Sequence, residues 1–597
     1  MTAGFDLDAE LAAGREDAKR QVERERTGAG KAIAAALESG AAGKAPSPKA
    51  VGLVRRAVRT MDEGHAAAAK AAKLCLKAID MEPDFALAHQ AMALCLERLG
   101  RLSSALGFYQ RAYDLDPRNA DLYLNLGMLA WKLDMLDTAE TFLRLHTKMA
   151  PHSMAGTSNL AGLLRDQQKY ADSIEILRAA IYANPDSPDL WNSLGTTLLE
   201  SGDLHQAATF YQEALRLNPD FDRAHHNLAY CLDLMGDLDA AVSHFRTALS
   251  LGPTQVDKTT MEHGLSLTLL AAGRFEDGWA LYESRLSPHY KHSVHFHVDA
   301  PRWDGLDPEA LKGKRVLVVG EQGLGDEVAF ASLLPDIIKA AGPDGEVALA
   351  CERRLAPLFQ RSFPGLEIVN HSTAQREGRT FRVTAPLAGG PPQIWLAPGT
   401  AHRAFRQSRG DFPARPHLAA DPERVAALRE TLAGFGAGPK VGLLWKSLKM
   451  NANRSKYFAS FDAWRPLIET AGVTFVNMQY GDVADDLAEV KRVTGVEIKQ
   501  VEGLDLKDDL EGLTALGAAL DLTVGPMNAS SSLTAAAGGR VWLLHGSPAP
   551  WTLLGSDEVL WYPGSRSFTA DTFGAWGPLL RTVADELAEF ARRAAAA

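Results

Sequence analysis

Small and large apolar residues recur every 34 positions along residues 86–253 of this chain. The small residues are alanines that stand at two places of the period, each in four of the five units: Ala105, Ala139, Ala207 and Ala241, then Ala112, Ala180, Ala214 and Ala248. The large residues fall between them at Tyr109, Leu143, Leu177, Tyr211 and Phe245. Six prolines keep the same register: Pro83, Pro117, Pro151, Pro185, Pro219 and Pro253. Each proline ends a second helix, because proline cannot donate the helical hydrogen bond. This period predicts stacked helix–turn–helix units that share one core.

The position and size of these residues resemble the tetratricopeptide repeat over five consecutive units. Gly127 and Gly195 are expected where two helices of a unit approach closely, and Gly100, Gly202 and Gly236 at turns. A degenerate unit at about 52–85 and a register-shifted one at 273–286 are expected to cap the array. Residues 1–40 predict a charged amphipathic helix and 41–50 a flexible linker. The expected domains are therefore 1–50 (helix and linker) and 51–290 (array).

A row of polar residues lies at the sixth position of successive first helices, at Asn125, Asn159, Ser193 and Asn227. In tetratricopeptide folds the first helices line the concave surface, and an amide side chain can both donate and accept hydrogen bonds. The row is similar to the asparagine ladder of the nucleocytoplasmic O-linked N-acetylglucosamine transferases. That similarity implies that the row binds the extended backbone of a protein acceptor. Alternatively, these side chains cap or bridge neighbouring helices. His89 and His225 are interpreted as groove or packing residues.

Beyond residue 300 the pattern changes to short apolar runs that alternate with helical segments. The runs predicted as buried parallel strands are 315–320, 346–351, 366–369, 440–445, 473–478, 521–525 and 540–545. An irregular stretch, 371–420, separates two sets of strands, each of which predicts a doubly wound sheet. We therefore expect an α superhelix followed by a two-lobed α/β region. Its lobes are expected at 300–420 and 421–597, with a ligand cleft at the carboxyl ends of the strands.

The first of these strands runs directly into Gly-Glu-Gln-Gly-Leu-Gly-Asp-Glu at 320–327. Gly323 and Gly325 are expected to let a donor approach backbone N–H groups at a helix start. The spacing matches neither the dinucleotide-binding nor the P-loop fingerprint. The Leu-Gly-Asp element resembles the start of heptosyltransferase-like glycosyltransferases, which implies that Asp326 is the general base toward an acceptor hydroxyl. Alternatively, Asp326 or Glu327 caps the helix.

Two segments of the second lobe are candidate anion sites. Lys446 ends a predicted strand and Arg454 follows in a loop, so both are expected to neutralise a leaving phosphate; ordinary surface charge is the alternative. A helix start with hydroxyls suits phosphate oxygens, and an extended N-cap is the alternative for it. Its candidate residues are Asn528, Ser530, Ser531 and Ser532. The stretch is similar to the Asn-Gly-His-Thr-Thr element of the O-linked N-acetylglucosamine transferases, with Ser530 in place of histidine.

Three further stretches complete a family pattern: FVNMQYGD at 475–482, GLDLKDDLEGLTALGAALDLTVG at 503–525 and WYPGSRSF at 561–568. Together they resemble bacterial proteins that join tetratricopeptide repeats to a GT-B glycosyltransferase domain, and in particular the flagellin-modifying enzymes of stalked alphaproteobacteria. The resemblance implies transfer of a nonulosonic, pseudaminic-type acid from a CMP-sugar to Ser or Thr of flagellin. Gln479 is expected among the donor-binding residues. No cofactor is expected besides the nucleotide-sugar substrate.

Two alternatives to this activity stay open. One is a scaffold or adaptor with an inactive glycosyltransferase-like lobe, because Met527 and Ser532 depart from the heptosyltransferase pattern. The other is transfer from a UDP-sugar, as in the O-linked N-acetylglucosamine transferases. In the second part of the chain no carboxylate pair stands at a predicted strand end, so a metal-independent mechanism is expected, with protein cations in the role of a metal.

Composition argues against several other classes of protein. The net charge of -11 disfavours a nucleic-acid grip or an anionic membrane surface. No run approaches the ~18 apolar residues of a membrane span, and the acidic N-terminus does not read as a secretory signal. Four scattered cysteines without CxxC spacing are interpreted as buried reduced thiols, so a cytoplasmic protein is expected.

Overall fold

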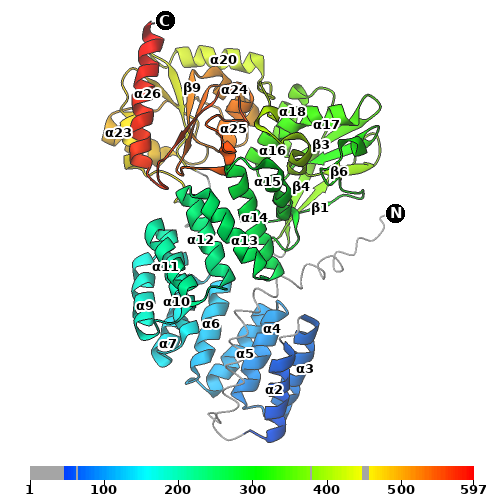
Figure 1. Ribbon diagram of the computed structural model, residues 1–597, viewed down its shortest axis with the longest axis vertical. Helices are drawn as coiled ribbons and strands as arrows, with labels where there is room; N and C mark the ends of the chain where they lie inside the picture. Colours follow the sequence, from blue (N-terminus) through cyan, green and yellow to red (C-terminus); the bar gives the residue numbers. More distant parts are fainter. Residues whose placement is uncertain (1–45, 62–64, 377–378, 447–455, 597) are drawn as a thin grey trace. The chain divides into compact units, whose positions relative to one another are not determined.

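The computed structural model describes residues 46–61, 65–376, 379–446 and 456–596 (Figure 1). The helix predicted over 1–40 and the candidate residue Arg454 lie outside these ranges. The chain forms two compact units. One comprises residues up to 228 together with 247–260, and the other comprises 229–246 together with 261–597.

Helices in succession build the first unit and begin the second. Their bounds are α2 (Pro48–Met61), α3 (His65–Met81), α4 (Ala86–Arg98), α5 (Leu102–Leu115), α6 (Ala120–Lys132), α7 (Leu136–Met149), α8 (Met154–Asp166), α9 (Tyr170–Ala183), α10 (Pro188–Ser201), α11 (Leu204–Leu217), α12 (Asp222–Met235), α13 (Leu238–Ser250) and α14 (Gln255–Ala271). Because α2 begins at Pro48, residues 48–50 belong to a helix and not to the predicted linker.

The predicted close contacts within units are present. A methyl group added at Gly127 would lie 2.7 Å from Leu143, and one at Gly195 would lie 2.8 Å from Tyr211. A larger residue would therefore push the two helices of a unit apart. The left-handed turn position also repeats every 34 residues. It holds Gly100, Gly202 and Gly236 as expected, and also Asp134 (φ 61°) and Gln168 (φ 60°).

A second repeated interaction fixes each register proline. In four units, a side chain six residues after the proline hydrogen-bonds to the proline carbonyl oxygen. The pairs are His89 with Pro83 (2.8 Å), Tyr123 with Pro117 (2.9 Å), Trp191 with Pro185 (2.7 Å) and His225 with Pro219 (3.0 Å). Chemically different residues thus satisfy the carbonyl left over at the end of the preceding helix. This supports the packing interpretation of His89 and His225.

The α/β region contains two sheets. The first has the order β1 (Val294–His297), β5 (Arg379–Thr384), β4 (Glu367–Arg376), β3 (Glu346–Cys351), β2 (Arg315–Val319) and β6 (Ile394–Leu396). Its neighbours are parallel except for the antiparallel pair β4–β5. The second is parallel throughout, in the order β11 (Arg566–Thr569), β10 (Val541–His545), β9 (Leu522–Pro526), β7 (Lys440–Leu443) and β8 (Thr474–Asn477).

The expectation of an irregular stretch at 371–420 was wrong. This segment contains the end of β4 and all of β5 and β6. The strand β5 escaped prediction because its one buried side chain is the cationic Arg382, so it shows no apolar alternation. The edge strands β1 and β11 were also missed, and β1 begins before the expected start of the lobe at 300.

Helices connect and cover the strands of the α/β region (Figure 1). The α-helices are α15 (Phe275–Tyr282), α16 (Leu324–Phe330), α17 (Leu334–Ala341), α18 (Ala356–Ser362), α19 (His402–Phe405), α20 (Pro422–Ala433), α22 (Phe461–Ile468), α23 (Ala484–Thr494), α24 (Leu510–Ala519), α25 (Ala529–Ala536) and α26 (Trp576–Ala596). Short 3-10 turns of this region include η1 (Glu283–Leu286), η4 (Arg353–Leu355), η5 (Pro398–Ala401) and η7 (Trp551–Leu553).

The second sheet is covered on both faces. Along β10, Val541 and Leu543 pack with side chains of α24 and α25, whereas Trp542 and Leu544 pack with α22 and α26. This alternation is what a doubly wound sheet requires. The predicted cap, α15, is part of the core of the α/β region. Its Trp279 stacks on His402 at 4.2 Å and donates its indole N–H to the Arg406 carbonyl oxygen at 2.8 Å.

Candidate functional site

A cavity of about 550 Å³ lies where helices from both sheets begin. The first turn of α16, which follows β2, contributes Gly325 and Asp326. The first turn of α25, which follows β9, contributes Ala529 and Ser532, preceded by Asn528. Aromatic walls complete it, from Phe330, Tyr457, Phe458, Tyr480, Trp551 and Trp561. The position, at the carboxyl ends of parallel strands, is where ligands bind in open α/β sheets.

Asp326 supplies the acidic side chain of this cavity. One of its carboxylate oxygens accepts the backbone N–H of Gly323 at 3.0 Å, so Asp326 also caps the start of α16. Burial raises its pKa to about 6, with smaller contributions from the charges of Glu321 and Glu327. A carboxylate with that pKa is ionised at neutral pH and still able to take up a proton, which suits a general base.

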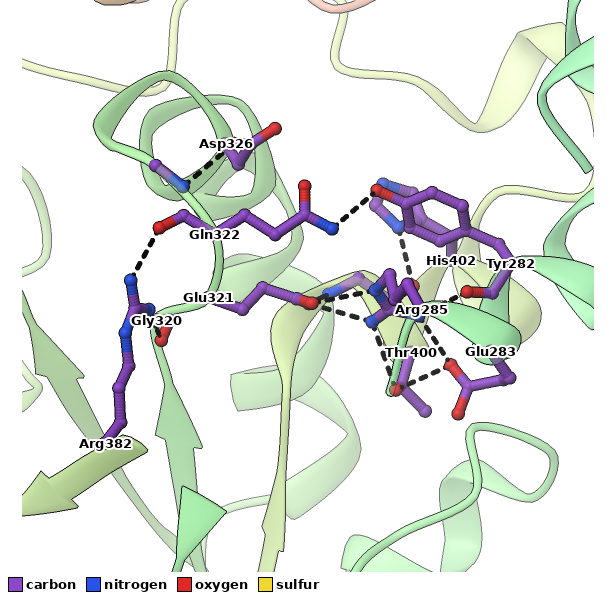
Figure 2. A network of polar contacts seen from close by, with 12 residues as sticks. Tyr282, Glu283, Arg285, Gly320, Glu321, Gln322, Asp326, Arg382, Thr400 and His402 are labelled. Carbon is purple, nitrogen blue, oxygen red and sulfur yellow. Dashed lines mark hydrogen bonds and ion pairs between the residues drawn. The ribbon is translucent and has the colours of Figure 1, made fainter. Parts of the chain in front are cut away.

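The turn before α16 is held by a network of buried polar side chains, which Figure 2 shows. Arg285 of η1 donates to both carboxylate oxygens of Glu321, at 2.7 and 2.8 Å. Glu321 also accepts the Gly399 backbone N–H at 2.6 Å. From β5, Arg382 donates to the carbonyl oxygen of Gly320 and, at 2.7 Å, to that of Gln322. The fold tolerates these buried cations because each is hydrogen-bonded or paired.

Glu327 does not cap α16, although the sequence left that alternative open. Its buried carboxylate hydrogen-bonds to His371 Nε2 at 2.9 Å and accepts the Glu352 backbone N–H at 3.0 Å. Gly320 makes room for it, because a methyl group there would lie 2.6 Å from the Glu327 carboxyl carbon. Packing within the protein therefore requires glycine at position 320 of this turn. Added methyl groups at Gly323 and Gly325 would meet other atoms only at 3.5 and 3.7 Å.

The start of α25 uses two of its predicted anion-binding residues internally. The Asn528 side chain accepts the Ser531 backbone N–H at 3.1 Å, and the Ser531 hydroxyl oxygen accepts the Asn528 backbone N–H at 2.8 Å. These two bonds form the capping box that was the alternative interpretation. Ser532 lines the cavity, whereas Ser530 is buried and its hydroxyl has no hydrogen-bond partner among the described residues.

Lys446 and Gln479 make contacts at the end of β7. Lys446 is paired with Asp486 of α23, which also accepts the Trp445 indole N–H at 3.0 Å. The Gln479 side-chain oxygen accepts the backbone N–H groups of Trp445 and Lys446 at 3.1 and 3.0 Å. It borders a smaller pocket of about 180 Å³ that shares Tyr480 with the main cavity. Among the described residues, no lysine or arginine lines the main cavity.

The predicted acceptor row divides into two kinds of contact. Asn227 donates to Asn192 at 3.0 Å and so bridges neighbouring helices, and the Ser193 hydroxyl donates to the Asp189 carbonyl oxygen of its own helix at 2.8 Å. Asn125 is buried, and its side-chain nitrogen has no partner in the part of the chain that the structure describes; Asn159 is half-buried. The bridging alternative therefore describes Asn227, and a role in acceptor binding stays a prediction for the row.

Sequence reasoning missed the residues that hold the site together. Arg285 lies in the segment interpreted as a cap, and Arg382 lies in the stretch interpreted as irregular. Trp551 and Trp561 are cavity residues that the sequence did not predict, although Trp561 begins the stretch WYPGSRSF at 561–568 that carries the family resemblance. A buried arginine has no sequence signature of its own; only a strand assignment for 379–384 would have shown that Arg382 points into the fold.

Over residues 46–596, apart from the gaps given above, no helix is long and apolar enough to cross a membrane. In the same residues, no three or more His, Cys, Asp or Glu side chains are grouped so that they could hold a metal ion.

Comparison with known proteins finds matches to the repeat array and to most of the whole chain. Tetratricopeptide repeat models match residues 65–120, 120–153, 158–220 and 198–257, which confirms the predicted array. The chain is 42% identical over 525 residues to protein FlbA of Caulobacter vibrioides, covering 88% of this chain and 87% of FlbA. Among solved structures, YrrB, a TPR protein, matches with 20% identity and a TM-score of 0.25, covering 31% of this chain and 95% of YrrB. MamA of Desulfovibrio magneticus RS-1 matches with 19% identity and a TM-score of 0.26, covering 28% of this chain and 96% of MamA.

Proposed function

Because the chain belongs to the same family as protein FlbA of Caulobacter vibrioides, we propose one function for its two parts, that of a protein O-glycosyltransferase. The tetratricopeptide array binds a protein acceptor, and the α/β region, which we assign to the GT-B type, binds a nucleotide sugar. The acceptor in this proposal is flagellin and the donor is a CMP-linked nonulosonic acid, as the sequence resemblance implies. A UDP-sugar is the alternative donor. The reaction takes place in the cytoplasm.

The observation that carries this proposal is Asp326 in an aromatic cavity at the strand ends. Its pKa of about 6 allows it to take the proton from a Ser or Thr hydroxyl of the acceptor. As the proton moves to Asp326, the acceptor oxygen forms a bond to the anomeric carbon of the sugar. The bond from that carbon to the phosphate oxygen breaks, and the nucleotide leaves with the bonding electrons.

The walls of the cavity suit a sugar more than a bare anion. Trp551 and Tyr480 offer rings against which the apolar face of a sugar can pack, and Ser532 and Asn528 offer hydrogen bonds. The start of α25 directs backbone N–H groups and the positive end of the helix dipole toward the leaving phosphate. Lys446 and Arg454 are the cations we assign to the same phosphate.

Transfer to purified flagellin tests the proposal. The full chain is incubated with flagellin and, in turn, CMP-, UDP-, GDP- and ADP-sugars, and the intact mass of flagellin is measured. We expect a mass increase of one or more sugar residues with the CMP-sugar. Asp326→Asn should lower the initial rate by about 10²- to 10⁴-fold, the usual contribution of a general base. The control Asp304→Asn changes an exposed carboxylate outside the cavity and should leave the rate unchanged. No mass increase with any donor would refute the proposal.

A scaffold remains the second candidate, and one observation favours it. In the described part of the chain no cation lines the cavity, and Lys446 is paired with Asp486. Isothermal titration of the full chain with CMP and UDP separates the two candidates. A glycosyltransferase should bind at least one nucleotide, whereas an inactive lobe should give no heat with either while acceptor binding by the array persists.

A further inference from the structure

Gln322 adopts a backbone conformation that non-glycine residues avoid. Its φ is 58°, in the left-handed region. Two of the other described non-glycine residues with positive φ, Asp134 and Gln168, occupy the turn position that repeats in the array. Gln322 belongs to no such repeat and lies four residues before the candidate base Asp326. Unfavourable conformations of this kind persist where the surroundings impose them, and they concentrate at functional sites.

Two buried arginines contact the turn around Gln322 from different elements. Arg382 of β5, 5% exposed, donates to the carbonyl oxygens of Gly320 and Gln322 and so grips the turn through its backbone. Arg285 of η1, 2% exposed, binds Glu321, the residue between these two, through two hydrogen bonds to its carboxylate. Figure 2 shows both guanidinium groups directed at the turn.

The consequence of this turn is the position of Asp326. With Gln322 left-handed, the next backbone N–H, that of Gly323, points at the Asp326 carboxylate and lies 3.0 Å from it. We propose that Arg285 and Arg382 are positioning residues that hold Gln322 in this conformation and thereby orient Asp326 in the cavity. This inference rests on the proposed function, in which Asp326 is the base.

The stability of the folded protein alone does not account for these two buried arginines. Apolar side chains of similar volume in place of a buried ion pair often leave a protein equally stable or more stable. Here both guanidinium groups contact the same turn, at Gly320 to Gln322. Both belong to segments that are distant from it in sequence. Their shared target is the backbone that leads into α16.

Several charged or titratable groups face Asp326 and must be considered in any test by pH. Those that interact with it electrostatically are Glu321 and Glu327 from its own segment, Tyr282 from α15, Arg382 from β5 and Tyr562 from the segment between η7 and β11. Loss of the Arg382 cation or of the Gly323 hydrogen bond would disfavour the Asp326 carboxylate. Either change should therefore raise the pKa of Asp326.

We call the contacts of Arg285 and Arg382 with the turn at 320–323 the clamp. Two measurements that need no transfer activity test it on the full-length protein. The first is hydrogen–deuterium exchange of peptides covering 320–327. The second is the pH midpoint of carbodiimide modification of Asp326, followed by peptide mass, because the reagent reacts with the protonated carboxyl group. The variants are Arg382→Met, Gln322→Val and Gln322→Gly. The control is Arg302→Met, since Arg302 is an exposed arginine whose side chain pairs with Glu283, at the rim of the network, at 3.5 Å.

We expect Arg382→Met and Gln322→Val to increase exchange of 320–327 by about tenfold or more, as for the loss of a hydrogen bond to a charged group. Both should also move the modification midpoint above that of the wild type. Gln322→Gly, which adopts positive φ without strain, and Arg302→Met should keep the wild-type midpoint. If Arg382→Met does not fold, the two Gln322 variants carry the comparison.

Unchanged exchange in Gln322→Val, or increased exchange with the wild-type midpoint, would overturn the proposal. The second result would mean that the clamp orders the turn without positioning Asp326. Failure of the proposed function is seen separately, as the absence of any sugar on flagellin with the wild-type protein, and neither clamp measurement depends on that assay.

Discussion

Gly325 and Ala529 bring the first turns of α16 and α25 together. A methyl group added at Gly325 would lie 3.7 Å from the backbone nitrogen of Ala529, which is ordinary van der Waals contact. The two helices follow strands of different sheets, β2 and β9, so the contact joins the halves of the cavity. Asp326 and Asn528 flank it on either side. One carbon atom thus fits beside Ala529, whereas a longer side chain would extend into the cavity that Gly325 lines.

Substitutions at Gly325 should separate folding from donor binding. Gly325→Ala fits the available space and should retain both the fold and nucleotide binding. Gly325→Leu places three further carbons in the cavity, so we expect loss of nucleotide binding by at least about tenfold, since overpacking costs about 1–3 kcal/mol. Calorimetric titration of each variant with CMP measures the effect. Equal affinity in both variants would mean that the donor does not approach this turn.

The rate of transfer should follow the ionisation of Asp326. Burial raises its pKa to about 6, so the base is mostly ionised at pH 7.5 and mostly protonated at pH 5. A protonated carboxyl cannot accept the proton of the acceptor hydroxyl. We therefore expect kcat/KM to fall about tenfold per pH unit below about 6. Initial rates between pH 5 and 8 test this, and a profile that stays flat down to pH 5 would exclude Asp326 as the base.

Asp486 should restrain the binding of the donor phosphate. It forms an ion pair with Lys446, and it also accepts the Trp445 indole N–H at 3.0 Å. If Lys446 binds phosphate, Asp486→Asn removes the competing charge and should tighten nucleotide binding a few-fold, whereas Lys446→Met should weaken it. Both side chains are about one-third exposed, so the effects should shrink at high salt. Tighter binding in Lys446→Met would contradict this assignment.

Two members of the polar row should behave differently. Asn227 bridges to Asn192, so Asn227→Ala should lower the stability of the array by about 1 kcal/mol, the usual worth of one hydrogen bond. Asn159→Ala should leave stability unchanged and weaken binding of flagellin. Thermal unfolding and flagellin binding, measured on both variants, check the contrast. If Asn159→Ala binds flagellin like the wild type, the acceptor lies elsewhere.

Asp233 on α12 should make the second unit less stable as pH rises. Burial raises its pKa to about 6, above the value of about 4 in an unfolded chain. Between those values the unfolded state loses its proton first, so stability falls with increasing pH and the full penalty, at most about 3 kcal/mol, is present above pH 6. Asp233→Asn removes the charge. It should raise the apparent unfolding temperature at pH 7.5, raise it less at pH 4.5, and leave it nearly unchanged below about pH 3.5.

The sequence by itself determined everything that repeats or is local. The 34-residue spacing specified the helix pairs, the close contacts at Gly127 and Gly195 and the left-handed turns, because each depends on neighbours within one unit. The interior strands could be recognised from their apolar runs. Asp326 and the start of α25 could be singled out because glycines, carboxylates and hydroxyls at a strand–helix turn are visible without any distant partner.

Only the tertiary structure decided what surrounds those residues. Arg285 lies 36 positions from Glu321 and Arg382 lies 62 positions from Gly320, so neither pairing leaves a periodic or local signal. In the strand β5 the buried side chain is the cationic Arg382. Strands are recognised from buried apolar side chains, so β5 lacks that signal. The pairing of Lys446 with Asp486, 40 positions apart, likewise depends on a contact that only the fold creates. A buried polar network gains its stability from partners that folding brings together, and its chemistry therefore emerges only in three dimensions.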